Sequence, residues 1–326
     1  MIEEVYGNIF RIQIPLPNSP LKGLNSYLLR GSPRSLLIDT GFRMPECRDA
    51  LFQALAGLDV DMECTDIFLT HLHSDHTGLA PEIATDDTQV FLSAVDIGYF
   101  LDFQNEKKTS QQVERLLRKG FSMEELERMD DNNPARQYAP RPFKRLTPVQ
   151  DGDMLNYAGY NLRCVATPGH TPGHTCLYLP EEKLIFLGDH VLFDITPNIT
   201  DWAGFDNSLG AYLSSLDTIA AYDITMPLPA HRGVKGTVYE RIESLKQHHH
   251  KRLEEVMSIL RRRPGQRAYD IAGKMTWSIV CDSWQEFPLK QKWFAVGEAA
   301  SHLDYLIASG LACRENDGAY DLYQAM

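Results

Sequence analysis

Three histidines and an aspartate fall within six consecutive positions of this chain, directly after a short apolar run. The run covers residues 67–69, and the segment that follows it at 70–76 reads Thr-His-Leu-His-Ser-Asp-His. Because side chains alternate along a strand, a strand that runs into a tight turn can aim the first two histidines at one point, and the turn can bring the aspartate and the third histidine there. Imidazoles with a carboxylate are suitable ligands for zinc, iron or manganese. The spacing predicts a metal site, with a histidine-rich polar turn as the alternative. The candidate ligands in this segment are His71, His73, Asp75 and His76.

Three more candidate ligands follow in similar settings. His170 lies in the turn-rich segment Thr-Pro-Gly-His-Thr-Pro-Gly-His, Asp189 ends the run Leu-Ile-Phe-Leu-Gly-Asp, and His231 ends a short apolar segment. Each lies at or just past the end of a presumed strand, where loops carry chemistry and the scaffold holds them in place. We therefore expect these residues to converge with the first group on one site.

The ordered set His-x-His-x-Asp-His, Pro-Gly-His, Gly-Asp and a later His resembles the metallo-β-lactamase superfamily of dinuclear metal hydrolases. The resemblance covers about the first 235 residues and implies an α/β fold, an αββα sandwich with two divalent metal ions at one edge of the paired sheets. We expect the ions to be zinc. Iron and manganese are alternatives, because geometry and availability decide which metal binds more than ligand type does. The resemblance implies three roles: the first metal is held by His71, His73 and His170, the second by Asp75, His76 and His231, and Asp189 bridges them.

Three other residues are expected beside these ligands. Asp39 follows the apolar run 35–38, and the resemblance places there an acid that supports a ligand histidine, since a metal-bound histidine needs a partner on its other ring nitrogen. A turn or helix-capping role is the alternative for Asp39. His174 is expected to make structural hydrogen bonds. His190 is expected behind the ligands or simply buried, with assistance to a leaving group as the alternative.

The chain of 326 residues is long enough for two domains. We predict a catalytic domain at 1–236 with a helical insertion at 96–145, which covers the metal edge as a lid or is an inert decoration. Residues 237–326 predict three helices and a hairpin around the Asn-Asp-Gly turn at 316–318. This pattern resembles the winged-helix appendage of β-lactamase-like protein 2 relatives.

The charge of the chain limits its partners. The formal net charge is −12, and residues 237–326 carry 12 Lys and Arg against 12 Asp and Glu. Phosphate binding normally needs a net basic face, so we do not expect nucleic acid as a partner. Interdomain packing or homodimer formation is the expected role of the C-terminal part. We predict a cytoplasmic protein with no membrane partner. Its six cysteines are scattered, its first residues are acidic, and it lacks an apolar run of about 20 residues.

Two metals about 3.5–4 Å apart can share a hydroxide and hold it against a carbonyl or phosphoryl centre. Asp75 is the predicted catalytic residue, which orients that hydroxide and takes its proton. No Gly-x-Ser-x-Gly elbow is present, so hydrolysis without a covalent enzyme intermediate is expected. The cysteine-containing zinc β-lactamases have a cysteine where this chain has Asp189. The ligand set of this chain therefore looks more like that of the glyoxalase II, lactonase and ribonuclease members. We predict a small ester, thioester or lactone as substrate. The alternatives are a metal-dependent endoribonuclease or phosphodiesterase, and a non-catalytic metal-bearing sensor or binding protein.

Overall fold

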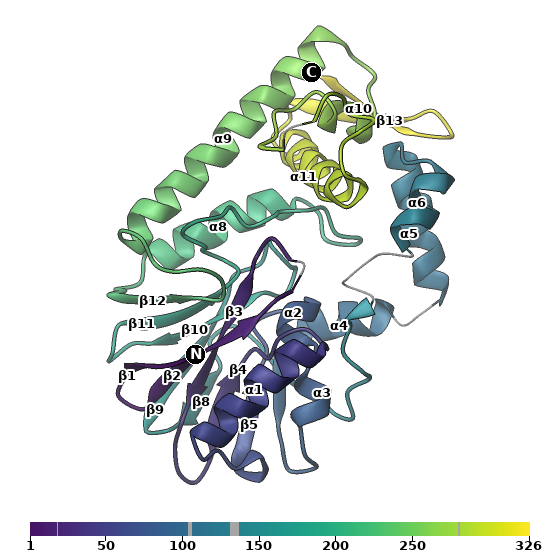
Figure 1. The fold of residues 1–326 in the computed structure, drawn as a ribbon. Helices are drawn as coiled ribbons and strands as arrows, with labels where there is room; N and C mark the ends of the chain where they lie inside the picture. The colour runs from purple at the N-terminus through teal and green to yellow at the C-terminus, as the bar shows by residue number, and fades with distance from the viewer. Residues whose placement is uncertain (18, 104–105, 131–136, 280) are drawn as a thin grey trace. The chain divides into compact units, whose positions relative to one another are not determined.

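The computed structural model describes residues 1–17, 19–103, 106–130, 137–279 and 281–326, which form two compact units (Figure 1). The first unit comprises Met1–Phe100, Pro134–Pro197 and Ser215–Ile242. The second comprises Leu101–Asn133, Asn198–Ser214 and Glu243–Met326. The chain thus passes between the units more than once. The domain boundary expected at residue 236 stays a prediction.

The first unit contains two sheets. In the seven-stranded sheet the first four strands are antiparallel neighbours and the last four run parallel to one another. Its order is β1 (Ile2–Tyr6), β2 (Ile9–Pro15), β3 (Gly23–Leu29), β4 (Ser35–Ile38), β5 (Thr65–Phe68), β6 (Val90–Ser93) and β7 (Thr147–Val149). The five-stranded sheet is antiparallel except for its β11–β12 pair. Its order is β12 (Met226–Pro229), β11 (Leu184–Gly188), β10 (Thr175–Leu179), β9 (Tyr160–Ala166) and β8 (Met154–Tyr157).

The alternation of side chains along the strands builds the core. On β5, Phe68 packs in a cluster with Leu177 and Phe186 of the five-stranded sheet. Its neighbour Ile67 points the other way, into a cluster with Leu51 of helix α1 (Pro45–Gly57). One face of the large sheet therefore meets the second sheet and the other face meets a helix. The predicted α/β sandwich is confirmed.

The remaining elements of the N-terminal part are short: the 3-10 helix η1 (Met62–Cys64), α2 (Ser74–Thr77) and α3 (Ala80–Ile83). Within the predicted insertion the structure contains α4 (Ala94–Phe103), α5 (Glu106–Lys119) and α6 (Met123–Asp130), while 104–105 and 131–136 lie outside the described residues. The lid role of this segment stays a prediction.

Helix α8 (Ser208–Ala220) lies between β11 and β12 along the chain, and the described residues of the C-terminal part form three helices and a hairpin. These are α9 (Val238–Arg262), α10 (Ala268–Ala272), α11 (Leu289–Ala308), β13 (Ala312–Asn316) and β14 (Asp321–Ala325). Its identity as a winged helix stays a prediction. None of the described helices has both the length and the apolar character that a membrane span requires.

Candidate metal centre

The candidate ligands lie just past the ends of four strands. His71 follows β5, His170 follows β9, Asp189 follows β11 directly, and His231 follows β12. All four belong to the first unit, in which strands fix the chain up to a few residues before each ligand. Each of these candidate ligands thus lies past the end of a strand, and its role as a ligand stays a prediction.

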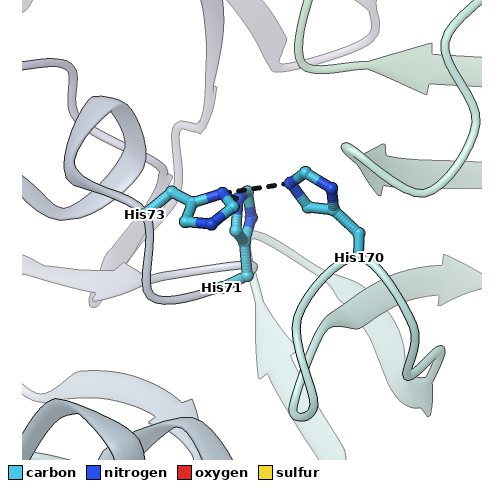
Figure 2. A group of neighbouring side chains, drawn as sticks. All are labelled: His71, His73 and His170. Carbon is cyan, nitrogen blue, oxygen red and sulfur yellow. Dashed lines mark hydrogen bonds between the residues drawn. The ribbon is translucent and has the colours of Figure 1, made fainter. Parts of the chain in front are cut away.

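Three histidines meet from two loops of this unit. Figure 2 shows His71 and His73 from the loop after β5 and His170 from the loop after β9, with their rings directed toward one another. His73 Nδ1 lies 3.0 Å from His71 Nε2 and 3.0 Å from His170 Nε2. Two nitrogens on one tetrahedral zinc ion lie about 3.3 Å apart, so these three atoms are spaced as ligands of a single ion would be.

A second group joins Asp75, His76 and His231. The Oδ2 atom of Asp75 lies 3.4 Å from His231 Nε2 and 3.8 Å from His76 Nε2. Because all three side chains are buried, their polar atoms face one another instead of solvent. The group offers two nitrogens and a carboxylate to one cation.

Asp189 reaches both groups with different oxygens. Its Oδ1 lies 3.3 Å from His231 Nε2 and 3.6 Å from His76 Nε2, while its Oδ2 lies 3.6 Å from His170 Nε2. This is the arrangement that a carboxylate bridging two metal ions needs. The bridging role stays a prediction.

Buried polar atoms without partners show that a divalent cation fits here. His76 Nε2, Asp189 Oδ1 and His231 Nε2 are buried and have no hydrogen-bond partner in the part of the chain that the structure describes. An unsatisfied buried polar atom costs about 1–3 kcal/mol, and three of them face one point. A bound cation would satisfy all three, and imidazole and carboxylate donors suit zinc, iron and manganese alike.

Hydrogen bonds at the Nδ1 atoms of His71, His76 and His231 fix the orientation of these rings. Asp39 Oδ2 lies 2.7 Å from His76 Nδ1 and accepts the Thr70 hydroxyl at 2.8 Å. His71 Nδ1 lies 3.0 Å from Thr70 Oγ1, and His231 Nδ1 lies 2.8 Å from a backbone carbonyl oxygen. With Nδ1 of each ring used in this way, Nε2 is left for the metal. Asp39 is buried and has a φ of +58°, a strained value for a residue other than glycine.

The two remaining predicted residues, His174 and His190, are both fully buried. His174 Nε2 accepts the backbone N–H of Asp189 at 3.1 Å, and its Nδ1 lies 2.7 Å from Thr167 Oγ1. Both of its nitrogens are thus used in hydrogen bonds, and no candidate cluster includes it among the described residues. His190 is fully buried, and burial lowers its pKa to about 3, which keeps the ring neutral.

Negative charge concentrates at the site. Burial lowers the pKa of His76, but the carboxylates of Asp39, Asp75 and Asp189 outweigh it and raise that pKa to about 10. Burial raises the pKa of Asp75, but His76 and His231 outweigh it and hold that pKa below its usual range. The negative electrostatic potential that favours a proton on His76 also favours a bound metal cation.

Asp96 is a site residue that sequence reasoning missed. It lies in the first turn of α4 and is fully buried, and it accepts hydrogen bonds from both ligand-bearing loops. The only local signal is an acidic residue in the first turn of a helix, which is common and usually exposed. Nothing in that signal indicates partners 24 and 77 positions away.

Comparison with known proteins agrees with this geometry. The family model described as the metallo-beta-lactamase superfamily matches residues 21–231, more than half of the chain. Among solved structures, the chain is 29% identical to a metallo-beta-lactamase family protein from Thermus thermophilus. The structural alignment has a TM-score of 0.82 and covers 99% of this chain and 100% of that one.

Two fungal proteins are among the curated relatives. The chain is 26% identical over 321 residues to a lactamase-like protein of Neosartorya fischeri, covering 85% of this chain and 80% of that protein. It is 25% identical over 244 residues to an atrochrysone carboxyl ACP thioesterase of Aspergillus novofumigatus, covering 74% of this chain. The match spans 60% of that thioesterase.

Proposed function

The chain belongs to the metallo-beta-lactamase superfamily, and from this premise we propose that it hydrolyses a small thioester with the aid of two divalent metal ions, which we expect to be zinc. The convergence of seven buried or half-buried candidate ligand side chains carries the proposal, because three of their atoms are buried and have no hydrogen-bond partner within the described residues. Relatives named as thioesterases support a thioester over the ester and lactone also expected from the sequence.

Bound metal ions would lower the pKa of a water molecule and polarise the scissile carbonyl group. Asp75 is ionised at neutral pH and 8% exposed, so its carboxylate can orient the attacking water and accept a proton from it. A C–O bond forms and the C–S bond breaks, which yields a carboxylic acid and a thiol. Since the chain has no Gly-x-Ser-x-Gly elbow, we infer that water attacks the carbonyl carbon directly.

A substrate panel tests the reaction. Thiol release from acyl thioesters is measured beside hydrolysis of esters, lactones, phosphodiesters and short RNA, with metal-loaded and chelator-treated samples of the same protein. We expect thioester turnover that chelation abolishes and that zinc restores. Turnover of RNA or phosphodiesters alone would favour the nuclease alternative. A fully metallated sample that turns over nothing would favour the sensor.

A single-turnover reaction in ¹⁸O-labelled water tests the direct attack. The proposal predicts one labelled oxygen in the acid product of the first turnover. An acyl group trapped on the protein would contradict it.

A further inference from the structure

The first ligand group is assembled from two loops that leave different sheets. His71 and His73 follow β5 of the seven-stranded sheet, whereas His170 follows β9 of the five-stranded sheet. Their nitrogens must stay about 3 Å apart to share an ion, although the two loops are joined covalently only through a long stretch of chain. Something in the first unit has to fix the distance between these loops.

Asp96 contacts both loops with its two carboxylate oxygens. Its Oδ2 accepts the backbone N–H of Leu72, at 3.0 Å, and the hydroxyl of Thr171, at 2.8 Å. Its Oδ1 accepts the backbone N–H of Gly173, at 2.7 Å. Leu72 lies between His71 and His73, and Thr171 directly follows His170. One side chain therefore holds the residue next to every ligand of this group.

The backbone packs closely around this carboxylate. A Cβ atom added to Gly173 would overlap Ser93 Oγ and lie 2.7 Å from Asp96 Oδ1, so only glycine lets the loop come this near. Ser93 Oγ in turn accepts the backbone N–H of Asp96 at 3.1 Å, which anchors the start of α4. Asp96 is fully buried and makes no salt bridge within the described ranges, so the hydrogen bonds from these donors stabilise its carboxylate.

We propose that Asp96 is a positioning residue for the metal centre formed by His71, His73 and His170, and that it sets the distance between the two loops carrying them. The inference rests on the proposed function, because it concerns the same metal site. Asp96 itself touches no ligand side chain in the hydrogen bonds described above, so it acts through the backbone of the loops. Supporting groups around metal ligands typically change metal affinity or activity by about 10–100-fold.

Asp96→Asn is the informative substitution. The amide keeps the size of the side chain, but its NH₂ group cannot accept the hydrogen bonds that one of the two oxygens now receives. We expect two bound Co²⁺ equivalents in the wild-type protein and about a 10–100-fold weaker affinity for one of them in the variant. The readouts are elemental analysis and titration of metal-free protein with Co²⁺, followed by visible absorption.

Asp66→Asn is the matched control. Asp66 is an equally buried carboxylate of the first unit, and it accepts hydrogen bonds from the Arg34 side chain, the Tyr157 hydroxyl and the backbone N–H of Gln89. It lies at the far end of β5 from the ligands. This control should lower the free energy of unfolding while both Co²⁺ affinities stay at the wild-type values.

Thr171→Val covers the case in which Asp96→Asn does not fold. It removes one hydroxyl donor and leaves the carboxylate and both backbone donors in place. We expect a several-fold loss of affinity for the same Co²⁺ equivalent. Wild-type Co²⁺ affinity and spectra in both variants would overturn the positioning role while the proposed function stands. A wild-type protein that binds no Co²⁺ would overturn the proposed function and the positioning role together.

Discussion

Asp39 Oδ2 lies 2.7 Å from Nδ1 of His76, and both side chains are buried. The contact fixes the imidazole with its Nε2 toward Asp75 and Asp189 and supplies the negative charge that a ligand histidine needs behind it. Because Thr70 also donates its hydroxyl to Asp39, the same carboxylate supports His71 indirectly.

Asp39→Asn should therefore weaken metal binding. We expect about a 10–100-fold loss in affinity for the ion held by Asp75, His76 and His231, measured by competition with a chromophoric chelator. Asp86→Asn, at an exposed carboxylate paired with Lys144, is the control and should bind metal as the wild type does. Equal affinities in the two variants would contradict the supporting role of Asp39.

Asp75→Asn should remove the proton acceptor. General acid–base groups contribute about 10²–10⁴-fold to a rate, so we expect kcat to fall by that factor in a thioester assay. Metal content must be measured in the same sample, because Asp75 is also a candidate ligand. Unchanged kcat in a fully metallated variant would remove the catalytic role from Asp75.

Gly188→Ala should strain the end of β11. Gly188 has a φ of +50°, and an added Cβ atom would lie 2.5 Å from His174 Nε2 and 2.9 Å from Thr70 Cβ. We expect the free energy of unfolding to fall by about 1–3 kcal/mol, together with weaker metal binding, because the next residue is Asp189. Chemical denaturation and elemental analysis measure the two effects.

Gly98→Ala is the matched control for this substitution. Gly98 lies exposed in α4, and an added Cβ atom would meet nothing within 4 Å. Alanine should stabilise the helix by up to about 1 kcal/mol. A Gly188→Ala variant as stable as the Gly98→Ala variant would show that the end of β11 tolerates a side chain.

The candidate ligands could be selected from the sequence because their signal is local, and their role as metal ligands stays a prediction. His71, His170 and Asp189 stand in short polar motifs directly after apolar runs, and the structure brings them together as expected. The superfamily and the α/β sandwich are likewise confirmed. Asp96 could not be found in this way, because its partners are loop backbone groups far along the chain, and no pattern of residue types records a backbone N–H donor.

The sequence also did not indicate which segments make up the second unit. Residues 101–133 and 198–214 group with the C-terminal segment because of contacts made in the folded state. In that unit Lys119 and Asp201 form a buried ion pair, although 81 residues separate them. Hydrophobic periodicity indicates which face of a helix is buried but not which element covers it. The homodimer, the cytoplasmic location and the winged helix stay predictions.

A buried histidine pair should make the second unit sensitive to acid. His302 Nδ1 lies 2.7 Å from the Glu298 carbonyl oxygen and donates to it, which leaves Nε2 to accept from His249 Nδ1 at 3.3 Å. Both rings are buried, and burial lowers the pKa of His302 to about 4 and that of His249 well below its usual value. In the unfolded chain both histidines become protonated below a pH of about 6.5, whereas in the folded state they stay neutral to a lower pH.

The free energy of unfolding should accordingly fall as the pH drops from about 6.5 toward 4, by up to about 1.4 kcal/mol per pH unit for each histidine. His302→Gln removes one of the two titrating groups, so its unfolding free energy should depend less steeply on pH, as measured by denaturant titrations at several pH values. His250→Gln, at an exposed position on the same helix as His249, should keep the wild-type slope. Any pH dependence from the metal site is common to all three proteins and cancels in their differences. Parallel curves for His302→Gln and the wild type would show that the pair does not control acid stability.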